Sequence, residues 1–118
     1  MDIFIYNLYL QPLMLKKIIK GALIGIVKEL KIGDIELSAK DLIKIIMEYD
    51  IKHVEIPDMA NLSGCADHDK RRIYVDDALS IEQKCKTVIH ECLHVKYGKM
   101  KERDVERYAI LLYEKLFG

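Results

Sequence analysis

One segment decides the fold of this chain: residues 80–97 read SIEQKCKTVIHECLHVKY. Ser80 followed three residues later by Gln83 is the pattern of a capping box, which predicts a helix from residue 81 to about Tyr97. One face of this helix is apolar and comprises Ile81, Cys85, Val88, Cys92 and Val95. That face is expected to pack against a core, which leaves the opposite face for other contacts.

The opposite face of the same helix carries the strongest functional signal. His90, Glu91 and His94 have the spacing H-E-x-x-H. Because residues four apart lie on one side of a helix, both imidazoles can reach one cation, while Glu91 lies about 100° around the helix at the open side. Imidazole nitrogens are preferred zinc ligands, so the pattern predicts a Zn²⁺ site. The alternative is a solvent-exposed face that carries two histidines by chance.

The helix predicted at residues 101–117 is the place to look for the third protein ligand of a catalytic zinc. Its apolar face comprises Val105, Tyr108, Ala109, Leu112, Tyr113 and Leu116. In helical projection Glu102 lies within this face and Glu106 lies next to it, whereas Asp104 points away. A carboxylate facing a core is costly unless a cation meets it. We therefore predict Glu102 as the third ligand, and Glu106 as an acceptor for an imidazole N–H.

The N-terminal part of the chain predicts two helices. Residues 3–10 fit either a strand or the start of a helix, and Pro12 is expected to open an amphipathic helix over residues 13–30. Ser38 is a candidate N-cap for a second helix that ends near residue 50. We expect helix 13–30 to pack against the core. The alternatives are that it binds a membrane surface or a second copy of the chain, which would give a homodimer.

The middle of the chain predicts short strands. Residues 52–56 alternate as in a half-buried strand, and residues 62–66 and 72–75 form a hairpin around a polar turn. His53 and His68 are expected at the surface. Helices, then short strands, then a pair of helices indicate an α+β fold, with a small sheet of three to four strands packed on helices. We assign residues 1–118 to one domain, with residues 1–33 as a helical segment of unassigned role.

Composition excludes several function classes. The chain has 118 residues, of which 51% are apolar and 32% charged, a balance typical of one globular domain. The formal net charge is zero and no basic stripe is evident, so nucleic acid is not expected as a partner. Lysines interrupt residues 13–30, so no membrane span is expected. The three cysteines lack C-x-x-C spacing and no leader is evident, which predicts a cytoplasmic protein with small, buried free thiols.

Residues 90–94 (HECLH), followed by residues 102–109 (ERDVERYA), resemble the gluzincin metallopeptidases, in which a third-ligand Glu precedes an acidic or amide group by four residues. The small size is similar to that of the minigluzincins, which are minimal soluble scaffolds. Residues 63–75 leading into the motif are also similar to repressor-cleaving regulatory peptidases. The resemblance covers roughly residues 38–112. It departs from the pattern in the short interval before Glu102 and in having Glu at position 106.

The resemblance implies a zinc-dependent peptidase, either active or latent, with a peptide or protein as substrate. Zn²⁺ would be held by His90, His94 and Glu102. Glu91 would take a proton from metal-bound water and hand it to the leaving amine.

The resemblance also implies that the peptide lies along an edge strand, for which Ser63, Gly64 and Cys65 are the candidates. The group that stabilises the oxyanion is left open among Tyr97, Tyr108, Tyr113 and His68.

Two other functions compete with hydrolysis. In a non-catalytic zinc module, a fourth side chain such as Cys65 or Glu106 would close the metal site. In a regulatory binding protein the motif would hold no metal at all.

Overall fold

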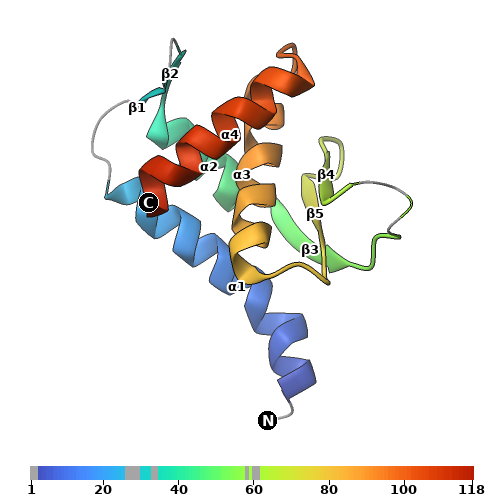
Figure 1. Cartoon of the computed structure of the whole chain (residues 1–118). Helices are drawn as coiled ribbons and strands as arrows, with labels where there is room; N and C mark the ends of the chain where they lie inside the picture. The colour runs from blue at the N-terminus through green and yellow to red at the C-terminus, as the bar shows by residue number, and fades with distance from the viewer. Residues whose placement is uncertain (1–2, 26–29, 33–34, 58, 60–61) are drawn as a thin grey trace.

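The computed structural model describes residues 3–25, 30–32, 35–57, 59 and 62–118. Within these residues the chain forms four helices and five strands, drawn in Figure 1. In chain order they are α1 (Ile3–Ile24), β1 (Leu30–Ile32), β2 (Ile35–Leu37), α2 (Ala39–Glu48), β3 (Asp50–Val54), β4 (Gly64–Asp67), β5 (Arg72–Asp76), α3 (Ile81–Lys96) and α4 (Glu102–Phe117). The predicted α+β class is confirmed.

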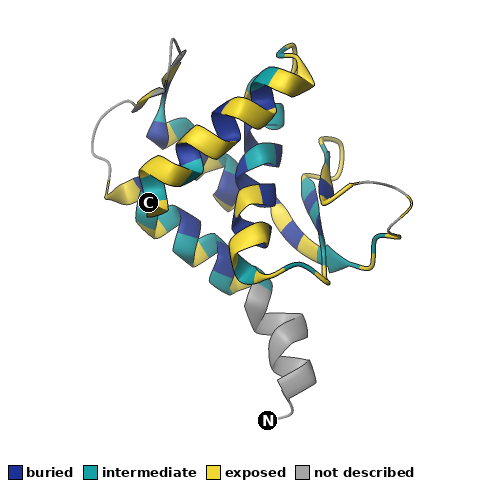
Figure 2. Cartoon of the chain, viewed as in Figure 1, coloured by how far each residue is buried: buried dark blue, intermediate teal, exposed yellow. Residues whose placement is uncertain are grey.

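Helix α3 is the centre of the fold. It contacts β4 and β5 on one side and α1, α2 and α4 on the other, as Figure 1 shows. Its buried apolar side chains include Val88, Ile89 and Leu93. Figure 2 shows that the buried positions of the helices face inward toward this shared core. The helix that carries the H-E-x-x-H motif is therefore held from both sides.

The sheet next to α3 has three strands in the order β3-β5-β4, with β3 parallel and β4 antiparallel to β5. The predicted hairpin is confirmed as β4 and β5. Its turn is fixed by Asp67, whose Oδ1 accepts hydrogen bonds from the backbone N–H groups of Asp69 and Lys70, both at 3.1 Å. Arg71 then adopts a positive φ of 52°. The strand predicted at residues 52–56 begins two residues earlier, at Asp50.

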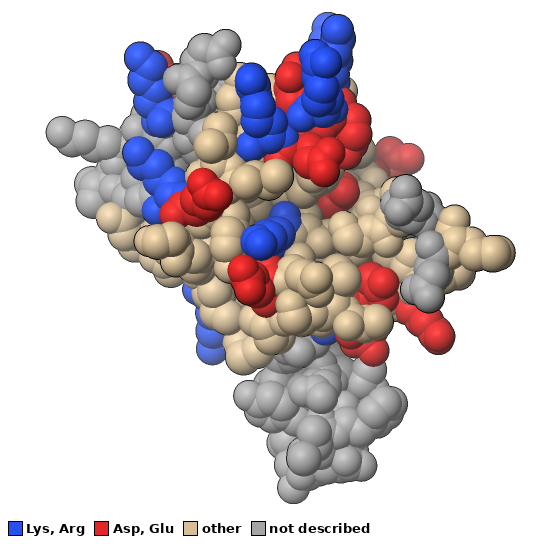
Figure 3. Space-filling view, viewed as in Figure 1, with Lys and Arg blue, Asp and Glu red and all other residues tan. Residues whose placement is uncertain are grey.

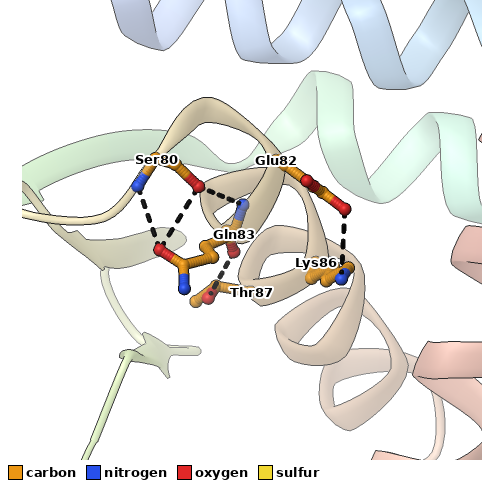
Figure 4. Close-up of polar contacts among 5 residues, drawn as sticks. All are labelled: Ser80, Glu82, Gln83, Lys86 and Thr87. Atoms are coloured by element: carbon orange, nitrogen blue, oxygen red, sulfur yellow. Dashed lines mark hydrogen bonds and ion pairs between the residues drawn. The ribbon is translucent and has the colours of Figure 1, made fainter.

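Both predicted N-caps are confirmed. The Ser38 hydroxyl accepts from the backbone N–H of Asp41 at 3.3 Å. At the start of α3 the capping box is complete: Ser80 Oγ accepts from the backbone N–H of Gln83 at 3.2 Å, and Gln83 Oε1 accepts from the backbone N–H of Ser80 at 3.1 Å (Figure 4). These bonds satisfy N–H groups that a helix start would otherwise leave unpaired.

Of the two alternatives for residues 3–10, the helix is confirmed, whereas the predicted opening at Pro12 and the predicted end at residue 30 are wrong. Helix α1 starts ten residues before residue 13 and ends at Ile24, and Pro12 lies inside it. A proline within a helix removes one backbone hydrogen bond, so local propensity argues for a start there. Packing overrides it, because Leu15, Ile19 and Leu23 are at most 1% exposed.

The two-stranded ladder of β1 and β2 was not predicted. Leu30 pairs with Leu37 in this ladder and does not end a helix. Within the described residues, the prediction that residues 1–33 form one helical segment is therefore wrong at residues 30–32, which form β1. In the described part of the chain no helix is long and apolar enough to cross a membrane. Figure 3 shows basic and acidic side chains interspersed on the face that α4 crosses.

Candidate metal centre

His90, Glu91 and His94 form a compact group on α3. One ligand atom from each lies within 4.8 Å of the others, so the three side chains could hold a metal ion. The Nε2 atoms of the two histidines are 3.1 Å apart. Their side chains are 21% and 25% exposed, so solvent can reach the imidazoles from one side. The convergence that the spacing predicts is confirmed.

Glu102 of α4 contacts the two histidines of this group. Its Oε1 lies 2.7 Å from Nε2 of His90, and its Oε2 lies 2.6 Å from Nε2 of His94. Glu102 is the first residue of α4, and residues 97–101 are all that separates the two helices. The Glu102 side chain is 66% exposed, so the expectation of a core-facing carboxylate is wrong. Its carboxylate is instead held at the protein surface by contact with the two imidazoles.

Glu91 is the buried acid of the group, with 8% exposure. Burial raises the pKa of its carboxyl above the usual 4.5, and the Glu102 charge acts in the same direction. The nearby His90, His94 and His68 oppose this rise. A carboxyl in a site of low polarity holds a proton more readily than one in water, which suits a group that must accept and release a proton near neutral pH.

Glu106 lies one turn beyond Glu102 and is exposed. It lines a surface cavity of about 170 Å³ together with Ser63, Lys86, Thr87, His90, Ala109 and Ile110. In the described part of the structure no hydrogen bond or ion pair is found for the Glu106 carboxylate. Its role as an acceptor for an imidazole N–H therefore stays a prediction.

The candidate edge strand lies directly beside α3. A Cβ built on Gly64 would lie 2.6 Å from Cγ2 of Thr87 and 2.4 Å from the backbone oxygen of Tyr74. Both distances are below any ordinary carbon contact, so only glycine lets β4 come this close to the helix, one turn before His90 and Glu91. Ser63 precedes this strand.

The cysteines divide into two classes. Cys65, the second residue of β4, is exposed, so the prediction that it is buried is wrong. The edge position of β4 leaves its thiol open, although partial burial and the charges of Glu91 and Asp67 still raise its pKa. Cys85 and Cys92 are buried as expected, and burial raises the pKa of Cys92 to about 12.

No comparison with known proteins gives a match. No family model matches the chain, and no curated protein or solved structure is similar enough to it to be counted as related. The assignment of this site therefore rests on its own residues and their geometry.

The candidates for oxyanion stabilisation lie in different surroundings. The Tyr108 hydroxyl accepts a hydrogen bond from Nη2 of Arg107 at 3.0 Å, and the Tyr113 ring stacks at a tilt on Phe117. Tyr97 is half-buried at the end of α3.

His68 lies in the β4–β5 turn and is exposed, as expected. It is close enough to Glu91 to lower the pKa of that carboxyl. The hydroxyl of Tyr49 lies 3.5 Å from Nδ1 of His68, a contact that sequence reasoning missed because the two residues are distant along the chain. The choice among the four candidates stays open.

His53 is half-buried, which corrects the prediction that it is a surface residue. Both ring nitrogens are buried and have no hydrogen-bond partner among the described residues. Burial lowers the pKa of its imidazole, and the charge of Lys84 lowers it further, whereas Asp77 raises it. The alternation of residues 52–56 gave no sign of this, because strand β3 packs against α1.

Proposed function

We propose that this protein is a zinc-dependent peptidase of the gluzincin type, with His90, His94 and Glu102 as the metal ligands and Glu91 as the general base. The observation that carries the proposal is the Glu102 carboxylate, which reaches Nε2 of both motif histidines from the neighbouring helix. Two imidazoles and one carboxylate are the three-ligand set of a catalytic zinc with one position left for solvent or substrate.

The donor atoms fit a zinc ion. Two ligands bound to zinc at tetrahedral angles lie about 3.4 Å apart. The Nε2 atoms of His90 and His94 are 3.1 Å apart, close to that value. The contacts from Glu102 are 2.6 and 2.7 Å, so its carboxylate would need to withdraw by about 0.7–0.8 Å to reach that separation. Its exposure leaves room for that movement.

Zinc, when bound, would supply a Lewis acid that polarises the scissile carbonyl and makes water more acidic. The chain supplies the proton transfers. Glu91 accepts a proton from the attacking water on a carboxylate oxygen and donates it to the nitrogen of the leaving amine. The burial that raises the pKa of Glu91 favours the first step, because a carboxylate of higher pKa is the stronger base, and it lets the carboxyl hold the proton until the amine leaves.

The free edge of β4 supports a peptide as the substrate. The backbone N–H of Asp76 donates to the carbonyl oxygen of Ser63 at 2.9 Å. With Gly64 opposite Val75, the alternation of an antiparallel ladder then turns the backbone groups of Gly64 and Ala66 toward the open edge. An extended peptide could pair there as an additional strand, beside the candidate metal ligands.

The test combines metal content with cleavage. Glu91→Gln keeps the size of the side chain and removes the base, so the zinc-loaded variant should retain its metal and lose about 100- to 10,000-fold in kcat/KM. Glu114→Gln makes the same change at an exposed position on α4, outside the cavity that His90 lines, and should leave kcat/KM unchanged. Cleavage that survives in Glu91→Gln contradicts the proposal.

A structural zinc module remains the competing function, favoured by the exposed Cys65 thiol on β4. Such a site would have four protein ligands, and chelation should unfold the chain. The apolar contacts of α3 and α4, which bury Val88, Val105 and Leu112, argue that the two helices stay packed without a metal. Circular dichroism before and after chelation separates the two functions.

A further inference from the structure

The cavity beside His90 is open to a substrate that reaches the candidate metal centre. It lies between α3, α4 and the residue that precedes β4, with His90 in its wall. Its volume is about 170 Å³. Pockets for whole drug-sized ligands measure about 300–1,000 Å³, so this cavity has room for one side chain.

The inner wall of the cavity offers little hydrogen bonding. Ala109 is buried, and Ile110 is apolar and 51% exposed. The Thr87 hydroxyl already donates to the backbone oxygen of Gln83 at 2.9 Å, as Figure 4 shows. This wall therefore suits the methylene groups of a side chain.

The two charged residues of the cavity differ in their partners. Nζ of Lys86 lies 3.3 Å from Oε1 of Glu82 (Figure 4) and 4.9 Å from the centre of the Tyr113 ring, so its charge already has partners. The Glu106 carboxylate has no such partner in the described structure, even from the exposed Arg103 one turn earlier. The unbalanced charge of the cavity is therefore negative.

We propose that this cavity binds one substrate side chain next to the scissile bond and selects lysine or arginine there. The methylene groups would lie against Ala109 and Ile110, and the cation would pair with Glu106. This inference rests on the proposed function and adds to it a substrate class, peptides with a basic residue beside the cleaved bond.

The experiment compares pairs of peptides in which one residue is either lysine or norleucine. In one pair this residue precedes the cleaved bond, and in a second pair it follows that bond. Norleucine has the methylene chain of lysine without the charge, so the ratio of the two kcat/KM values isolates the ion pair. For the zinc-loaded protein we expect lysine to be favoured about three- to fivefold, the worth of a partly exposed ion pair. The preference should shrink as salt is added.

Two variants assign the preference to the cavity. In Glu106→Gln the ratio should fall to about one, whereas Glu114→Gln, an exposed change on the same helix outside the cavity, should keep the ratio of the original protein. A ratio of one in the original protein, or an unchanged ratio in Glu106→Gln, would overturn the inference.

A binding measurement separates this inference from the proposed function. Calorimetry with zinc-loaded Glu91→Gln, with and without Glu106→Gln, reports affinity for the same peptides without hydrolysis. One outcome is that the original protein cleaves no peptide while the lysine peptide still binds more tightly than the norleucine peptide, and only when Glu106 is present. In that case the cavity assignment holds and the peptidase proposal fails. Equal binding of both peptides overturns the cavity assignment.

Discussion

Gly64 of β4 and Thr87 of α3 lie so close together that a Cβ on the glycine would be 2.6 Å from Cγ2 of the threonine. The contact sets the distance between the edge strand and the helix that carries His90 and Glu91. It also explains why a residue with no side chain stands at the first position of β4, where β propensity alone would favour a larger one.

Gly64→Ala should therefore lower the free energy of unfolding by about 1–3 kcal/mol, because the added methyl must displace backbone as well as side chain. Chemical denaturation measures the change. Gly21→Ala is the matched control: a Cβ at Gly21 meets nothing within 4 Å, and alanine in a helix should raise stability by up to about 1 kcal/mol. Similar effects for the two variants would contradict the close-packing argument.

Removal of the Glu102 carboxylate should weaken zinc binding more than removal of any neighbouring acid. Loss of a group that hydrogen-bonds to a metal ligand lowers metal affinity by roughly 10- to 100-fold. Glu102→Gln changes a proposed ligand itself, so we expect zinc affinity to fall by at least that factor. Asp104→Asn removes the same charge from the same first helical turn and controls for the helix dipole, so its zinc affinity should change by less than about threefold. Competition with a chromophoric chelator measures both, and equal losses would exclude Glu102 as a ligand.

His53 should make stability depend on pH. Its folded-state pKa lies below the ordinary 6.5, so the unfolded chain binds more protons as the pH falls below that value, and the free energy of unfolding should fall with it. His53→Leu should be about 1 kcal/mol more stable at pH 7, because two unpaired ring nitrogens are removed, and its advantage should grow at pH 5. Urea denaturation at both pH values tests this, and a constant difference between the proteins contradicts it.

The capping box at Ser80 should contribute to the stability of α3. Ser80→Ala removes the acceptor for the Gln83 backbone N–H and should cost about 1 kcal/mol. Ser63→Ala changes an exposed serine that caps no helix in the described structure and should cost less than about 0.5 kcal/mol. Thermal denaturation compares the two variants, and equal melting temperatures would show that the capping box does not contribute to stability.

The features that the sequence predicted well depend on residues close together in the chain. The Ser38 and Ser80 caps, the β4–β5 hairpin and the convergence of His90 with His94 each involve neighbours within a turn or two. Such patterns carry their own geometry, because hydrogen bonds and helical periodicity fix it locally.

The features that failed depend on what packs against a segment. Pro12 is tolerated inside α1 because Leu15 and Ile19 are buried in the core. A helical projection placed Glu102 inward and gave no sign of the burial of Glu91, yet the structure exposes the first and buries the second. The short link after α3 nevertheless leaves the Glu102 carboxylate within reach of both imidazoles, and its role as a metal ligand stays a prediction. The homodimer, the cytoplasmic location and the absence of a nucleic-acid partner stay predictions.

The open edge of β4 has a consequence for concentrated protein. If these backbone groups bind a peptide as we propose, they can equally pair with the same strand of another molecule, which would block the edge and inhibit the protein reversibly. The strand is only four residues long, from Gly64 to Asp67, so this self-pairing should be weak and should yield to substrate. Dilution would then increase the activity of each molecule.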